Sequence, residues 1–190
     1  MHIVVVDPDR ERAFQIVDGL SVDSSLRVTV LGDIDGIARK LTSLDPDVIL
    51  IDLADPKRDH FEQTLNAVGA TDRPVAMFVD KSDIGMTKAA IEAGVSAYVV
   101  DGLKKERVLP IIEMAVARFR EFDRIKKERD AANEALAERK VVDRAKGILM
   151  KAKGLSEEEA YSLLRKTAMD QGRKIGEVSE GIVTAAGLLS

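Results

Sequence analysis

The sequence predicts an α/β domain with a five-stranded, parallel, doubly wound sheet, followed by an all-α region. Three observations support this fold class. Short apolar runs alternate with helix-like segments through residues 1–105, residues 111–146 contain neither proline nor glycine, and two amphipathic segments follow residue 154. Parallel strands are joined by crossover helices that cover both faces of the sheet, which is why their sequences are apolar throughout rather than alternating.

The expected strands are the β-branched and apolar runs 2–6, 27–31, 47–51, 74–79 and 97–100. The expected helices between them are 10–20, 33–44, 62–68 and 84–93, the second capped by Asp33. Right-handed crossovers place the carboxyl ends of all parallel strands along one edge, where open α/β sheets hold their sites. Because Asp7, Asp52 and Asp101 each follow the apolar part of a strand, we expect them at that edge.

The 36 residues of 111–146 predict one long helix, which at 1.5 Å per residue spans about 54 Å. Spacings of three and four residues within it mark a coiled-coil seam formed by Phe122, Ile125, Arg129, Ala132 and Leu136. We expect this seam to form a homodimer, with packing of the stripe back onto the α/β domain as the alternative.

The C-terminal region predicts a small three-helix bundle. Its helices are the end of the long helix up to about residue 153, then 156–169 and 175–189, with Gly154 and Gly172 as C-terminal stops. Ser156 and Glu159 have the spacing of a capping box. Such a bundle is marginal in size unless the long helix supports it.

Composition excludes several classes of function. The chain has no cysteine and two histidines, which argues against thiol catalysis and against thiolate or histidine-rich metal sites. We expect no cofactor and no enzymatic activity, since no nucleophile–base pair is visible. No run reaches the roughly 18 apolar residues of a membrane span, and no signal peptide is evident, so we expect a soluble, cytoplasmic protein.

The two parts of the chain differ in the sign of their net charge. Residues 1–117 hold 13 basic and 20 acidic residues, a net charge of −7, whereas residues 118–190 hold 16 and 13, a net charge of +3. An acidic first part and a basic second part indicate two modules, the second able to meet a polyanion.

Residues 47–52 (DVILID), with Pro56 four residues later, resemble the phospho-acceptor segment of a response-regulator receiver domain. The resemblance covers about residues 1–120. It implies a carboxylate that accepts a phosphoryl group, an acidic pair that holds Mg²⁺, and a hydroxyl and a lysine that bind the phosphate. Asp52 matches the phospho-acceptor.

Most of the other receiver groups are replaced. Pro8 stands in place of the second acid, with Asp9 as a partial substitute, Val79 stands at the hydroxyl position, and Asp101-Gly102 replaces the usual lysine-proline. A carboxylate in place of a phosphate-binding cation reverses the sign of the interaction. We therefore expect an inactive Asp52 in a vestigial acidic pocket of Asp7, Asp9 and Asp101. The alternative is an active Asp52, with Lys104 or Lys105 reaching back to take the place of the phosphate-binding lysine.

The C-terminal residues carry the more specific motifs: 144–150 (RAKGILM), 159–161 (EAY), 164–165 (LR) and 168–169 (AM). In this order they resemble the ANTAR domain, an RNA-binding output module of transcription antiterminators. A receiver, a coiled coil and an ANTAR domain in this order resemble the AmiR and NasT regulators of two-component systems. The NasT regulators control nitrate and nitrite assimilation. The expected domains are 1–120, the linker helix 111–143 and the ANTAR domain 136–190.

The resemblance implies binding of paired hairpins in a nascent leader RNA, which prevents termination and involves RNA polymerase only indirectly. It also implies restraint by a nitrate-sensing regulatory protein of the NasS type. The residues expected to contact RNA are Arg144, Lys146, Gly147, Tyr161, Arg165, Lys166, Arg173 and Lys174. Arg165 could instead pair with Glu158 or Glu159, Tyr161 could belong to the core, and Gly147 could serve close helix packing.

A second function remains open, that of a phosphorylation-switched regulator that binds DNA through a helix-turn-helix. It requires the receiver groups that this chain lacks. Residues 175–189 also contain no lysine or arginine, and a helix without a cation is a poor reader of the major groove.

Overall fold

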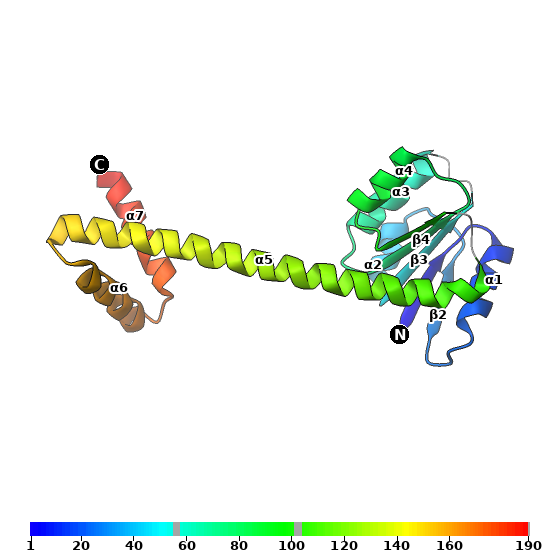
Figure 1. Cartoon of the computed structure of the whole chain (residues 1–190), viewed down its shortest axis with the longest axis horizontal. Helices are drawn as coiled ribbons and strands as arrows, with labels where there is room; N and C mark the ends of the chain where they lie inside the picture. The colour runs from blue at the N-terminus through cyan, green and yellow to red at the C-terminus, as the bar shows by residue number, and fades with distance from the viewer. Residues whose placement is uncertain (55–57, 101–103, 190) are drawn as a thin grey trace. The chain divides into compact units, whose positions relative to one another are not determined.

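The first part of the chain, Met1–Asp123, forms one compact unit that we call the head, and Arg124–Ser190 forms a second that we call the tail. The computed structural model describes residues 1–54, 58–100 and 104–189. The head contains a parallel sheet in the order β2-β1-β3-β4-β5 (Figure 1). Its strands are β1 (His2–Val6), β2 (Arg27–Leu31), β3 (Val48–Leu53), β4 (Val75–Val79) and β5 (Ala97–Val100). The predicted five-stranded parallel sheet is confirmed.

Helices cover both faces of this sheet, because successive side chains of a strand point to opposite sides. Ile3 and Val5 of β1 pack with α1 and the beginning of α5, whereas Val4 and Val6 pack with the helices of the other face. Figure 1 shows these two layers. The helices of the head are α1 (Arg10–Leu20), α2 (Ile37–Leu44), α3 (Arg58–Gly69), α4 (Ile84–Glu92) and the first part of α5 (Lys105–Lys153).

The prediction that Asp33 caps the second helix was wrong. The helix α2 begins at Ile37, and its N-cap is Gly36 in the left-handed conformation with no side-chain cap. Asp33 instead forms a salt bridge with Lys40, at 2.5 Å between Oδ1 and Nζ. An ion pair with a residue one turn inside the helix has replaced the cap that the local sequence suggested.

The helix α5 begins six residues before the predicted start and includes Pro110. Proline removes one backbone hydrogen bond, and the carbonyl thus released belongs to Glu106, an exposed residue that water reaches. Val108, fully buried against the sheet, holds this first part of α5 in place. Although α5 is 49 residues long, no helix in the described part of the chain has a stretch apolar enough to cross a membrane.

The tail contains the end of α5 together with α6 (Glu157–Gln171) and α7 (Ile175–Leu189). Gly154 and Gly172 have φ values of 69° and 61°, which favour glycine and end α5 and α6 as expected. The buried core has helical spacing and consists of Val142, Ala145, Leu149, Ala160, Leu164, Ala168 and Val178.

Candidate functional site

Exposed cations occur on three parts of the tail. Arg144 lies on α5, Arg165 and Lys166 lie on α6, and Lys174 precedes α7; all four are exposed. Within the described residues none of these four forms a salt bridge, so the alternative pairing of Arg165 with Glu158 or Glu159 is absent. Their guanidinium and ammonium groups are therefore available to an anionic partner.

Two further cations of the predicted set are engaged. Lys146 binds Asp143 and Glu157, each at 2.7 Å, and only 14% of its side chain is exposed. The hydrogen bonds that Lys146 donates to Asp143 and Glu157 raise the pKa of Lys146 above its usual value. Arg173 lies 3.4 Å from Glu177. Lys146 thus joins α5 to the first turn of α6, a structural role that the sequence did not reveal.

The capping box sets the position of that first turn. The Ser156 hydroxyl accepts the N–H of Glu159 at 3.3 Å, and the Glu159 carboxylate accepts the N–H of Ser156 at 2.8 Å. Glu157, Tyr161 and Arg165 follow at intervals of four residues and share one face of α6. Because Lys146 contacts Glu157, this face begins beside α5.

Tyr161 and Gly147 are both open to a partner. Tyr161 is 46% exposed and does not belong to the core. A methyl group added at Gly147 would meet no other atom within 4 Å, so close helix packing does not explain this glycine within the single chain. Gly176 is the glycine of the tail with a close neighbour, since a Cβ there would lie 2.9 Å from Cγ of Glu138.

The seam of α5 carries exposed apolar side chains. Phe122 is 70% exposed, Ile125 51% and Leu136 52%, and Ala132 is exposed as well. Arg129, the polar member, pairs with the adjacent Asp130 at 2.7 Å. Within the described residues these apolar side chains are therefore open to water.

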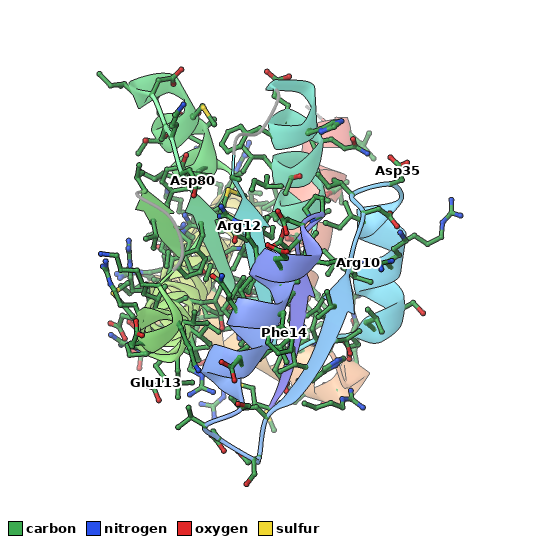
Figure 2. The ribbon with its side chains drawn as sticks, turned by 90° about the vertical axis from the view of Figure 1, so that its right-hand side faces the viewer. Arg10, Arg12, Phe14, Asp35, Asp80 and Glu113 are labelled. Atoms are coloured by element: carbon green, nitrogen blue, oxygen red, sulfur yellow. The ribbon has the colours of Figure 1, made fainter. Side chains whose placement is uncertain are left out.

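The acidic pocket of the head is filled by an arginine. Asp52, on β3, is fully buried. Its Oδ2 accepts Nε of Arg12 at 2.9 Å and its Oδ1 accepts Nη2 at 2.6 Å. Arg12 also donates to Asp80 at the end of β4, at 2.8 and 3.2 Å, and Figure 2 shows these two residues close together. Lys105, expected as a possible phosphate ligand, binds Asp18 instead.

The role of Arg12 was not predicted from the sequence, although a signal was present. Arg12, Ile16 and Leu20 follow one another at intervals of four residues, and Ile16 and Leu20 are buried against the sheet. A charged side chain that begins an apolar row on a helix indicates a buried partner of opposite charge. The acids at the ends of the strands supply that partner.

Asp7 lies at the end of β1 with one oxygen unsatisfied. Its Oδ1 accepts the N–H of Asp9 at 2.8 Å, while its buried Oδ2 has no hydrogen-bond partner among the described residues. Burial, together with the nearby charge of Asp52, raises the pKa of Asp7 to about 7. Burial likewise raises the pKa of Asp52, against the opposing hydrogen bonds from Arg12.

The residues present do not fit the Mg²⁺ ion that receiver domains hold. Pro8 offers no carboxylate, the Asp9 side chain caps α1 by accepting the N–H groups of Glu11 and Arg12, and both oxygens of Asp52 are taken by the guanidinium. The described residues contain no group of three or more acidic or histidine side chains that could hold a metal ion. Pro56, Asp101 and Gly102 lie outside the described residues.

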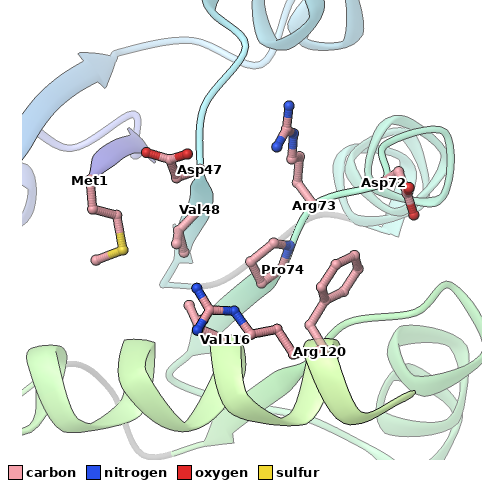
Figure 3. Close-up of a pocket in the computed structure, with 9 residues that line it drawn as sticks. Met1, Asp47, Val48, Asp72, Arg73, Pro74, Val116 and Arg120 are labelled. Atoms are coloured by element: carbon pink, nitrogen blue, oxygen red, sulfur yellow. The ribbon is translucent and has the colours of Figure 1, made fainter. Parts of the chain in front are cut away.

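A second cavity, of about 370 Å³, lies beside the amino ends of β3 and β4 (Figure 3). Two of its charged groups are engaged, because Arg73 binds Asp45 at 2.6 Å and Asp47 accepts the N–H of His2, also at 2.6 Å. Its apolar wall comes from Val48, Pro74, Val116 and Phe119. We assign it no ligand.

Comparison with known families identifies the tail. The sequence model of the ANTAR domain matches residues 130–183. The transcriptional regulatory protein PdtaR of Mycobacterium tuberculosis is 30% identical over 142 residues, which cover 75% of this chain and 69% of that protein. The nitrate regulatory protein of Klebsiella oxytoca is 30% identical over 83 residues, or 44% of this chain and 20% of that protein.

Comparison with solved structures identifies the fold of the head. A CheY-like receiver domain protein from Methanospirillum hungatei superimposes with a TM-score of 0.55 at 16% identity, covering 63% of this chain and 96% of that one. The BeF3-activated receiver domain of RstA from Klebsiella pneumoniae gives a TM-score of 0.52 at 20% identity, over 61% and 98%. With a receiver-like head and an ANTAR tail, the chain belongs to the ANTAR-domain family of transcriptional response regulators.

Proposed function

We propose that this protein is an RNA-binding transcription antiterminator. Its tail binds paired hairpins in a nascent leader transcript and favours them over an overlapping terminator hairpin, so that polymerase continues. The observation that carries the proposal is the coincidence of the ANTAR match, residues 130–183, with the exposed and unpaired Arg144, Arg165, Lys166 and Lys174. The activity requires no bond-breaking chemistry from the protein.

The chemistry of these groups suits RNA. Each phosphate neutralised by a cation releases counterions, which gives a slope near −0.7 per contact in a plot of log affinity against log salt for single strands. Loop bases are usually recognised by stacking and by hydrogen bonds to their edges. Tyr161 is the only aromatic residue after Phe122, so the guanidinium planes of Arg144 and Arg165 supply the remaining stacking surface.

Duplex DNA is the less favoured target. The helix α7, which would occupy the position of a recognition helix, has glutamates at positions 177 and 180 and no lysine or arginine. Base edges in the major groove are read chiefly by arginine, lysine, asparagine and glutamine. A helix with these charges would be repelled by the phosphates on both sides of the groove.

A direct titration tests the proposal. The full chain is titrated, over a series of salt concentrations, with a two-hairpin leader RNA and with a DNA duplex of equal length. We expect tighter binding to the RNA and an affinity that falls as salt rises. A preference for the duplex would contradict the proposal and favour the DNA-binding alternative.

Substitution of one arginine tests whether the exposed face of α6 binds RNA. Arg165→Ala is expected to weaken RNA binding by about tenfold and to make the salt slope shallower by about 0.7. Arg39→Ala, which removes an exposed arginine from α2 in the head, is the matched control and should leave both quantities unchanged. Equal effects of the two variants would show that only net charge matters.

We also propose that two chains pair through the seam of α5. Phe122, Ile125, Ala132 and Leu136 present an exposed apolar row on a helix, and burial of such a row against a second copy is the simplest way to remove it from water. Two tails would then be available for the two hairpins.

Control by a protein partner is proposed in place of control by phosphorylation. The surface of α4 and β5 has exposed Ile84, Ile91 and Val100, at 90%, 65% and 40%, beside a cavity of about 630 Å³. Clustered exposed apolar side chains often mark a contact surface for another protein. We assign this surface to the regulatory partner, and the likeness to the nitrate regulatory protein of Klebsiella oxytoca favours a partner that senses nitrate.

An in vitro transcription assay tests this form of control. Purified polymerase, leader template and the full chain are combined without a phosphodonor, and readthrough of the terminator is measured. We expect readthrough without a phosphodonor, and its suppression when the sensor protein is added without nitrate. A requirement for acetyl phosphate would contradict the proposal.

A further inference from the structure

One guanidinium occupies the pocket at the carboxyl edge of the sheet. Arg12 makes two hydrogen bonds to Asp52 and two to Asp80, and these four bonds use all three of its side-chain nitrogens. Bonds of this kind, in which a planar guanidinium meets a carboxylate in parallel, are strong and directional. The geometry ties the first helix of the head to β3 and β4.

We propose that Arg12 is a resident cation that closes this pocket against divalent metal ions and phosphoryl groups. Both oxygens of Asp52 already accept hydrogen bonds from Arg12, so neither is free to ligate a metal or to attack a phosphorus atom. Asp80, 41% exposed at its side chain, holds the guanidinium from the solvent side. The inference concerns the head alone and does not depend on RNA binding by the tail.

The burial of Asp52 explains why the pocket needs a cation of some kind. An ionised carboxylate that is fully buried is costly unless it is paired and hydrogen-bonded. In the described residues Arg12 is the cation that pairs with Asp52, and Lys105 is engaged with Asp18. Removal of the guanidinium would leave the carboxylates of Asp7, Asp52 and Asp80 at one edge without this positive charge.

These carboxylates do not form a group that could hold a metal ion in the natural chain, but carboxylates left without a counter-charge attract a small hard cation, for which oxygen is the preferred ligand. Loss of Arg12 should therefore create an affinity for Mg²⁺ that the natural chain lacks. The size of the gain is set by the competition between Mg²⁺ and protons for the same oxygens. The experiment is best done at alkaline pH, because burial raises the pKa of Asp7 to about 7 in the natural chain, and loss of the Arg12 charge, which lowers this pKa, raises it further.

The test compares Mg²⁺ binding by the full chain and by Arg12→Ala, followed by calorimetry and by backbone amide chemical shifts at the ends of β1, β3 and β4. We expect no saturable binding by the natural chain at millimolar Mg²⁺, and binding by Arg12→Ala that is tighter by about tenfold or more. Arg10→Ala removes an exposed arginine two residues away on the same helix, and it should behave like the natural chain.

Two results would overturn the proposal: Mg²⁺ binding by the natural chain as tight as by Arg12→Ala, or no gain in the variant. If Arg12→Ala does not fold, Arg12→Gln provides the same comparison, since its amide retains a donor to Asp52 without the positive charge. For that variant we expect Mg²⁺ to raise the melting temperature of the head, with no rise for the natural chain or for Arg10→Ala. An equal rise in all three would count against the resident cation.

Discussion

At the scale of single residues, the stability of the head depends on how its buried carboxylates are paired. Arg12 gives Asp52 two hydrogen bonds, whereas Oδ2 of Asp7 receives none among the described residues. The neighbouring charge of Asp52 also raises the pKa of Asp7. A protonated Asp7 carboxyl group therefore suits this position better than a carboxylate.

The replacement Asp7→Asn tests this reading through the pH dependence of stability. The pKa of Asp7 is about 7 in the folded head against a usual value of 3.8, so the folded state binds more protons than the unfolded state between these values. The natural chain should then lose stability as pH rises from about 4 to about 7. Asp7→Asn cannot ionise and should be the more stable protein above pH 7, by a few kcal/mol at most, as measured by urea unfolding.

The matched control is Asp47→Asn, the same change of charge at an exposed site in the head. The pKa of Asp47 is lowered because its carboxylate accepts the N–H of His2. Its ionised form therefore stabilises the fold at neutral pH, and removal of that charge should destabilise the head there. A parallel pH profile for Asp7→Asn and the natural chain would rule out the raised pKa.

At the scale of elements, α6 illustrates how far local signals determine structure. Ser156 and Glu159 close its first turn as a capping box, as the sequence indicated. The contact that joins this turn to α5, between Lys146 and Glu157, was not predicted. Ala160, Leu164 and Ala168 follow at intervals of four residues and lie in the core, because one face of an amphipathic helix is buried.

Ser156→Ala is expected to destabilise the tail by about 1 kcal/mol, since the cap hydroxyl satisfies an N–H group that has no partner within the helix. Amide hydrogen exchange at Leu164 on the buried face of α6 measures the effect locally. Ser162→Ala, at an exposed position inside α6, is the control and should leave exchange unchanged or slower, because alanine favours helix. Equal acceleration in both variants would exclude the cap as the cause.

At the scale of the whole molecule, α5 is shared by the two units. Its first part packs against the sheet, its last residues belong to the core of the tail, and residues 124–140 between them are all exposed, Ile125 of the seam included. A helix with an apolar row open to water is suited to self-association.

Leu136→Asp and Phe122→Asp should shift the chain towards monomer in sedimentation experiments, because each introduces a charge into the proposed pair of seams. We expect both to weaken binding to a two-hairpin RNA as well, although neither residue belongs to the basic set. Ala131→Asp, an exposed position of α5 outside the seam, introduces the same charge and should change neither. A monomeric natural chain, or unchanged RNA affinity in the seam variants, would contradict pairing through α5.

The sequence by itself determined the order of strands and helices, the two units, the capping box at Ser156 and the loss of receiver groups at Pro8 and Val79. Each of these follows from local periodicity, local hydrogen bonds or residue identity, which can be read along the chain.

Tertiary structure decided which charges meet. Arg12 reaches Asp52 and Asp80, which lie 40 and 68 residues away in sequence, and Lys146 reaches Glu157 across a turn. A local pattern can indicate that Arg12 faces the sheet, but it does not identify the partner, because an ion pair depends on the positions of two elements after they have packed. The identity of the cation in the acidic pocket was therefore decided by the packing of α1 beside the ends of β3 and β4.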